Sequence, residues 1–188
     1  MEAVKNWLKD LVEVTDEELE AINDIVETTL VKPNEVVLKQ GDIADKIGLL
    51  VQGAVRTYFT DTNGNERTIS FAFEGDPMIA ISSFFNRTPA NLACSTLEPT
   101  LFVWTDYERY NSFVNRFPHY NTVALTALGR GLGQDKYRLE YLHLTSAKER
   151  YDGMCAMHPK IIERVPLKYI ASYLGITQET LSRIRAKK

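Results

Sequence analysis

The sequence contains little cysteine or histidine, with two cysteines and three histidines among 188 residues. Cys94 and Cys155 are too few and too far apart in sequence for a disulfide framework, a zinc site or an iron–sulfur cluster. His119, His143 and His158 lie outside the β-rich middle of the chain, which disfavours a metalloenzyme with ligands on its strands. A haem could use His119 or Cys94, although a lone histidine is more often solvated or hydrogen-bonded.

Long apolar runs and catalytic motifs are also absent. No segment approaches the length of a membrane span, and the N-terminal sequence MEAVKNWLKD has no signal-peptide core, so we expect a cytoplasmic protein. No Ser-His-Asp set, phosphate loop or paired-carboxylate motif occurs at a meaningful spacing, which predicts that the chain is not an enzyme. Its composition, 44% hydrophobic and 25% charged, is that of a globular protein with room for one sizeable domain and one small domain.

Charge is distributed unevenly along the chain. The net charge of -3 and the pI near 5.7 would by themselves argue against nucleic-acid binding. Residues 160–188, however, contain seven basic and two acidic side chains, a net charge of +5, so the other 159 residues carry -8. An acidic body with a basic end is expected to approach DNA with that end first.

Residues 166–188, PLKYIASYLGITQETLSRIRAKK, predict two short helices joined by a tight turn. The apolar positions have helical spacing in two blocks, and Gly175 lies between the blocks, where a positive φ is needed. Ala171 leaves room for the second helix, Thr177 can cap that helix, and Glu179 favours its positive N-terminal end. This pattern is typical of a helix-turn-helix, and the alternative is a helical hairpin that only packs.

In a helix-turn-helix, the second helix enters the DNA major groove with its N-terminal residues against base edges. Arginine pairs with guanine, glutamine with adenine and glutamate with the cytosine amino group, and all three residue types are present here. Arg185, Lys187 and Lys188 suit phosphates, which position a protein without specifying sequence. The predicted DNA-binding residues are Thr177, Gln178, Glu179, Thr180, Ser182, Arg183, Arg185, Lys187 and Lys188.

The N-terminal half predicts one helix followed by strands. Thr15 and Glu18 have capping-box spacing, and we expect a first helix from about Asp16 to Glu27. Short runs rich in β-branched and aromatic residues then alternate with Gly, Asp and Asn; these are VVLK, GLLVQG, AVRTYFTD, ERTISFAFE and ACSTLEPTLFVWT. Five or more such strands predict a small antiparallel barrel or jelly roll, in which Asn63-Gly64 forms a hairpin turn with positive φ at both central residues.

Helical periodicity returns near Asp106. A short helix is expected to end at Phe117-Pro118, and one apolar stripe then runs over residues 119–144, interrupted by three glycines. A long helix with a single apolar stripe is often a dimer seam. Ser146 and Glu149 have the spacing of a second capping box, at the start of the C-terminal helices.

The order of helix, barrel, long helix and helix-turn-helix resembles the Crp/Fnr family of bacterial regulators over nearly the whole chain. The matching residues are 38–42, 48–53, Gly64, 69–73, 75–76, 179–180 and Arg183. The resemblance implies an α+β protein, with an antiparallel jelly-roll domain of cyclic-nucleotide-binding type at 1–117, a long dimerisation helix at 118–145 and a helix-turn-helix domain at 146–188. It also implies a homodimer that reads a palindromic DNA site under the influence of its sensor domain.

Two features depart from the pattern of that family. Nucleotide-binding members have a Gly-Glu pair for the ribose hydroxyl and an arginine followed by Ser or Thr for the phosphate, whereas residues 77–93 contain no glutamate and only Arg87, which precedes the proline. A buried phosphate without such donors carries an uncompensated charge, so the sequence argues against ordinary cyclic AMP binding and leaves the effector open. The family's β wing is expected to be absent, because the sequence ends at Lys188.

Other residues of the barrel could hold a different ligand. The candidates are Phe71, Ser82, Ser83 and Asn91, and the alternative is that the polar ones only cap turns in a barrel that binds nothing. The expected partners are double-stranded DNA, a second copy of the chain, RNA polymerase and a small-molecule effector, with no membrane. A ligand-sensing or partner-binding dimer without sequence-specific DNA binding is the alternative function.

Overall fold

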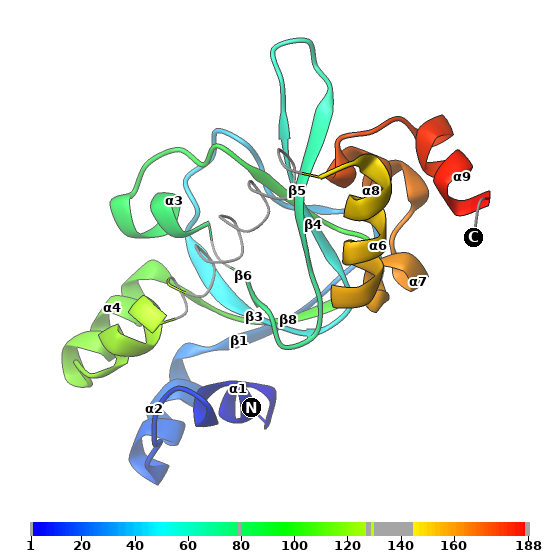
Figure 1. Ribbon diagram of the computed structural model, residues 1–188. Coiled ribbons are helices and arrows are strands. Elements are labelled where there is room, and N and C mark those ends of the chain that lie inside the picture. Colours follow the sequence, from blue (N-terminus) through cyan, green and yellow to red (C-terminus); the bar gives the residue numbers. More distant parts are fainter. Residues whose placement is uncertain (1, 79, 127–128, 130–144, 187–188) are drawn as a thin grey trace.

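The computed structural model of the chain describes residues 2–78, 80–126, 129 and 145–186. A β-domain of two sheets is flanked by α1, α2 and α4 at one end, and the C-terminal helices lie beside β4 and β5 (Figure 1). The elements are α1 (Glu2–Lys9), α2 (Asp16–Ile25), β1 (Glu27–Val31), β2 (Val36–Leu38), β3 (Lys46–Gln52), β4 (Val55–Thr60), β5 (Glu66–Ala72), β6 (Pro77–Met78), α3 (Ile81–Asn86), β7 (Ala93–Thr96), β8 (Thr100–Asp106), α4 (Tyr107–Arg116), α6 (Ala147–Met157), α7 (Pro159–Arg164), α8 (Leu167–Leu174) and α9 (Gln178–Ala186).

The strands form two four-stranded antiparallel sheets, in the orders β1-β8-β3-β6 and β2-β7-β4-β5. In both sheets, strands that are distant in sequence are neighbours: β8 lies between β1 and β3, and β7 lies between β2 and β4. Such crossovers are typical of a jelly roll: apart from the β4–β5 hairpin, each strand is followed in the chain by a strand of the other sheet. The predicted antiparallel jelly roll is therefore confirmed.

Apolar side chains form the core of this β-domain. Leu50, Val55 and Phe102 are fully buried, and the ring of Phe102 stacks on that of Trp104 with 4.1 Å between ring centroids. Burying a side chain of this kind stabilises a fold by about 1.5–3 kcal/mol. These residues come from β3, β4 and β8, so the core joins the two sheets.

The β4–β5 hairpin has a different turn from the predicted one. Gly64 has a positive φ of 80°, but Asn63 does not, so the expectation of positive φ at both central residues was wrong. Asp61 provides the reason, because its Oδ1 accepts hydrogen bonds from the amides of Asn63 and Asn65 at 3.0 and 2.9 Å. An aspartate that bonds the backbone in this way stabilises a loop with only one left-handed residue.

The N-terminal helices differ in part from the prediction. The capping box of Thr15 and Glu18 is present, but α2 ends at Ile25 because Val26 is extended and β1 begins at Glu27. Both α1 and β1 were missed, although residues 28–31, three of which are β-branched, were a signal for β1. Side chains of α1, α2 and α4 share one apolar cluster, which holds these helices together.

Helices α4 and α6, which follow the β-domain, both begin after a capping side chain. Asp106 caps α4, which ends before Phe117-Pro118 as predicted, and Ser146 caps α6 with the predicted capping box. Residues 120–126 are helical, whereas most of the predicted long helix over 118–145 lies outside the described residues. Among the helices that the structure describes, none has the length and apolar character to span a membrane.

Candidate nucleic-acid interface

Helices α8 and α9 are joined by a turn at Gly175. This glycine ends α8 in the left-handed conformation, with φ 67° and ψ 33°. The amide of Ile176 donates to the carbonyl of Ala171 at 3.0 Å, a hydrogen bond that closes the end of the helix. The predicted two helices and the positive φ between them are therefore confirmed.

The two helices meet through a small apolar core. Ile170, Ala171 and Leu174 of α8 and Leu181 of α9 are buried in one cluster. Ala171 is 2% exposed, so a larger side chain there would have no free space and would push α9 away. As the sequence predicts, the small Ala171 side chain allows the two helices to approach closely.

The N-terminus of α9 is capped by its own neighbours. Thr177 Oγ1 accepts a hydrogen bond from the amide of Thr180 at 3.2 Å, as the sequence predicts. The pKa of the Glu179 carboxyl is lowered, chiefly by a hydrogen bond from its own backbone amide. A hydrogen bond from the Thr177 hydroxyl and the positive charge of Arg183 lower it further. This carboxylate is therefore ionised and able to accept hydrogen bonds at neutral pH.

Six of the nine predicted DNA-binding residues are exposed, on α9 and on the turn before it. Thr180 is partly buried and accepts a hydrogen bond from Arg183 Nη2 at 3.3 Å. Lys187 and Lys188 lie outside the described residues. The exposed predicted residues are Thr177, Gln178, Glu179, Ser182, Arg183 and Arg185. One short helix thus presents amide, carboxylate, hydroxyl and guanidinium groups, which can pair with base edges and phosphates.

Helix α6 packs against α8 and α9. The guanidinium of Arg150 donates to the carbonyl of Leu174 at 3.0 Å and to that of Thr145 at 2.6 Å. It therefore joins the start of α6 to the last turn of α8, where carbonyls have no partner within the helix. Tyr151 and Met154 of α6 are buried in the same cluster as Leu174.

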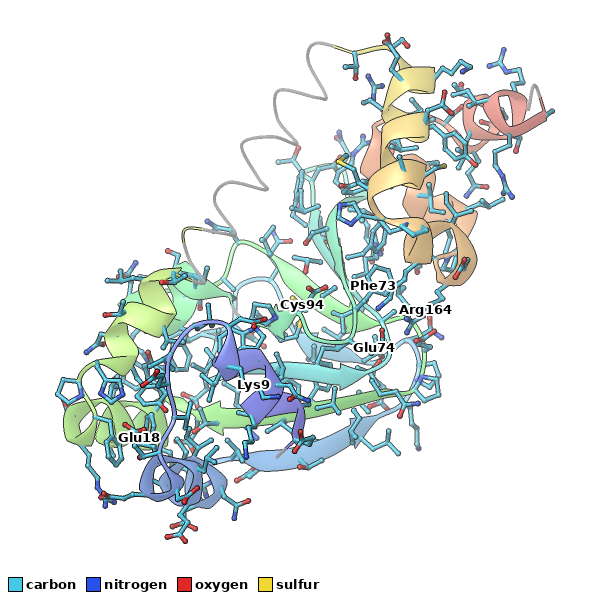
Figure 2. The ribbon with its side chains drawn as sticks, turned by 60° about the horizontal axis from the view of Figure 1, so that its bottom comes forward. Lys9, Glu18, Phe73, Glu74, Cys94 and Arg164 are labelled. Carbon is cyan, nitrogen blue, oxygen red and sulfur yellow. The ribbon has the colours of Figure 1, made fainter. Side chains whose placement is uncertain are left out.

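Two basic residues of the tail are engaged by the β-domain. Arg164 of α7 hydrogen-bonds to Glu74 and Glu98, and Lys160 forms an ion pair with Glu74 at 3.0 Å. Figure 2 shows the side chains of Arg164 and Glu74 side by side, between the C-terminal helices and the strands. Both residues belong to the basic segment 160–188 that was expected to approach DNA, and no local sequence pattern indicated that carboxylates of the barrel neutralise them.

The candidate ligand residues of the barrel do not form one site. Ser83 is buried; its hydroxyl accepts from the amide of Ala44 at 2.8 Å and donates to the carbonyl of Thr88 at 2.6 Å. Ser82 and Asn91 are exposed. Phe71 belongs to the apolar cluster under the C-terminal helices, where its ring centroid lies 5.4 Å from that of Tyr173.

Arg87, the cation of the same segment, is engaged within the fold. Its guanidinium donates to Asp45 at 2.7 Å and lies 4.3 Å from the centroid of the Tyr107 ring. It ends α3 in the left-handed conformation, with φ 53°. The side chain therefore ties α3 to the loop before β3 and to α4.

The candidate haem ligands are on different elements. His119 Nε2 lies 3.0 Å from Glu18 Oε1, beside α2, whereas Cys94 is buried in the β-domain core. Burial raises the pKa of the Cys94 thiol, which keeps it protonated. Within the part of the chain that the structure describes, no cluster of three or more His, Cys, Asp or Glu residues could hold a metal ion.

Comparisons with known proteins agree with this architecture. A family described as Cyclic nucleotide-binding domain matches residues 28–117. The chain is 20% identical over 186 residues to an anaerobic regulatory protein of Pasteurella multocida, a match that covers 91% of this chain and 66% of that protein. The chain thus spans about two thirds of the length of this curated relative.

Solved structures show the same fold. FixK2 of Bradyrhizobium japonicum matches with a TM-score of 0.74 and 17% identity, covering 87% of this chain and 84% of that one. A regulator assigned to the Crp/Fnr family from Eubacterium rectale matches with a TM-score of 0.73 and 17% identity, covering 95% of this chain and 85% of that one. Residues 28–117 are therefore similar to cyclic nucleotide-binding domains, and the chain has, over nearly its whole length, the fold of these solved regulators.

Proposed function

We propose that the chain is a DNA-binding transcription regulator that reads a palindromic site as a homodimer. The observation that carries this proposal is the arrangement of α8 and α9. Gly175 closes the turn between them, and the polar side of α9 is exposed from its first residue. A recognition helix needs this exposure, because its N-terminal residues must reach base edges in the major groove.

For this function we propose three parts of the chain, each with its own role. Residues 1–117 form the sensor domain, 118–145 the dimerisation helix and 146–188 the DNA-binding domain. The protein acts in the cytoplasm and is not an enzyme. Its partners are double-stranded DNA, a second copy of the chain, RNA polymerase and an effector of the sensor domain.

The sensor domain does not bind cyclic AMP through the usual contacts of its family. Arg87, the cation in residues 77–93, already holds Asp45 and the Tyr107 ring, and the hydroxyl of Ser83 holds two backbone groups. A phosphate in the barrel would have to break these contacts or remain without a charged partner, and either outcome weakens binding.

The test is selection of bound fragments from a random duplex DNA pool at moderate salt, with and without cyclic AMP. We expect enrichment of a palindrome whose half-site centres lie about one helical turn apart, or about 34–36 Å. Enrichment should be the same in both arms, and dependence on cyclic AMP would overturn the proposal about the pocket. If neither arm enriches a motif while the protein still forms a dimer, the partner-binding alternative replaces sequence-specific DNA reading.

A further inference from the structure

Arg56 of β4 is a buried cation at the contact between the β-domain and α8. The residue is 2% exposed, and its guanidinium contacts two tyrosine rings. The ring centroid of Tyr58, on the same strand, is 4.3 Å from Arg56 Cζ, and that of Tyr169, on α8, is 4.0 Å away. A desolvated guanidinium over a tyrosine ring is a favourable contact, so Arg56 attracts α8 to the sheet.

The rest of the guanidinium is held by β5. Arg56 Nε donates to Thr68 Oγ1 at 2.9 Å, and Nη1 forms an ion pair with Glu66 at 2.5 Å. A buried cation is tolerated only when its charge and its donors are matched in this way. The orientation of the guanidinium is therefore fixed by the sheet before α8 adds the ring of Tyr169.

Helix α8 makes further specific contacts beside Arg56. Ser172 Oγ accepts from the amide of Thr68 at 2.9 Å and donates to the carbonyl of Glu66 at 3.4 Å. These groups belong to β5, so the hydroxyl takes the place of a neighbouring strand at that edge of the sheet. Together with the Arg56–Tyr169 contact, this pair of hydrogen bonds sets both the position and the rotation of α8.

This contact leaves the reading side of the next helix free. Gln178, Glu179, Ser182 and Arg183 are exposed while α8 is docked on β5. The turn at Gly175 connects the two helices directly, so the orientation of α8 determines the direction in which α9 faces.

We propose that Arg56 is a positioning residue: through Tyr169 it fixes the helix-turn-helix on the sensor domain, with α9 facing outwards to read DNA. This inference rests on the proposed function and states how the β-domain controls it. In a dimer, two helices held in fixed positions bind two half-sites as one unit, whereas a loose helix loses this gain in effective concentration. The Arg56 contact therefore matters for a site with two half-sites and not for a single half-site.

The experiment compares Tyr169→Leu with Tyr169→Phe, because leucine keeps apolar volume without an aromatic ring and phenylalanine keeps the ring. Tyr169 is partly exposed, and both substitutions leave Arg56 and its partners on β5 in place. Ser172→Ala, which removes the hydrogen bonds to Thr68 and Glu66, is a second variant that acts on the same contact independently. Hydrogen exchange of the Thr68 amide measures docking without DNA, and affinities for duplexes with two half-sites and with one half-site measure reading.

Tyr169→Leu is expected to speed exchange of the Thr68 amide by loosening α8, whereas Ser172→Ala speeds it directly, because it removes the acceptor of that amide. Both should weaken binding to the two-half-site duplex about tenfold and leave the single half-site unchanged, while Tyr169→Phe behaves as the wild type. Equal affinity of Tyr169→Leu and wild type for two half-sites would overturn the positioning role, and so would an equal loss on both duplexes. If wild-type protein binds all DNA sequences equally, the proposed function fails. The wild-type measurement alone shows this failure, so it is distinguishable from a failure of the positioning role, which appears only in the variants.

Discussion

Arg164 of α7 donates hydrogen bonds to both carboxylate oxygens of Glu74, at 2.9 and 2.7 Å. Glu74 also accepts from the amide of Gly53 at 3.0 Å and pairs with Lys160, so one carboxylate joins a turn of the β-domain to the C-terminal helices. The Arg164 hydrogen bonds are the main cause of a pKa of Glu74 well below its ordinary value of 4.5. Glu74 is therefore a contact between domains whose strength depends on its ionisation.

Acid should weaken this contact. Because the pKa of Glu74 is lower in the folded state, the ionised carboxylate stabilises the fold at pH values above 4.5, and the contribution is lost as the pH falls towards the folded-state pKa. Urea denaturation of wild type and Glu74→Gln as a function of pH is the measurement. We expect a wild-type advantage in free energy of unfolding that is greatest above pH 4.5 and shrinks below it.

Glu163→Gln is the matched control, since Glu163 is an exposed carboxylate on α7, the helix that carries Arg164. It should change the free energy of unfolding less than Glu74→Gln does. A difference between wild type and Glu74→Gln that stays constant with pH would contradict the assigned role of the Glu74 carboxylate.

Gly53 should tolerate no side chain. Its φ is 110°, and a Cβ there would lie 2.5 Å from Thr100 Oγ1 and 2.7 Å from Thr100 Cα. Gly53→Ala is therefore expected to reduce the free energy of unfolding by at least about 2 kcal/mol. Gly41→Ala is the control, because Gly41 has a φ of 95° but open space around it, and it should cost about 1 kcal/mol. Equal losses in thermal or urea denaturation would show that the contact with Thr100 is unimportant.

Arg183 should read one base pair. Its guanidinium is exposed on α9 and can pair with guanine O6 and N7, so Arg183→Ala is expected to cost about 1–3 kcal/mol of specific binding and to relax the preference at one position. Titration against the selected site and its single-base variants measures both effects. Arg109→Ala, an exposed arginine of α4, is the control and should bind like wild type. An unchanged base preference for Arg183→Ala would mean that another side of α9 faces the DNA.

Arg185 should contact phosphate. It is exposed near the end of α9, away from the N-terminal residues that reach base edges. Arg185→Gln is expected to weaken binding to all sequences alike and to reduce the slope of log affinity against log salt concentration by about 1. Binding isotherms at several salt concentrations, on specific and random duplexes, give this slope. A loss confined to the specific duplex would assign Arg185 to base reading instead.

The sequence by itself determined the local features of this protein. The capping boxes at Thr15 and Ser146 and the turn at Gly175 involve residues no more than five positions apart, so their hydrogen bonds depend little on the rest of the fold. The alternation of short β-branched runs with turn residues likewise predicted the jelly roll. The hairpin at Asn63-Gly64 was placed correctly, but its turn type was wrong because the Asp61 side chain competes for the backbone amides.

Only the tertiary structure decided which charged groups remain available to a partner. Arg56, Arg164 and Arg87 are each engaged by residues at least ten positions away, and Arg164 meets Glu74 across 90 positions of sequence. No periodicity or spacing rule reaches over such separations, since these pairs exist only after the strands and the C-terminal helices have packed together. Burial makes the ion pairs and ring contacts specific, because a cation removed from water must be matched by carboxylates, hydroxyls or aromatic rings at fixed positions.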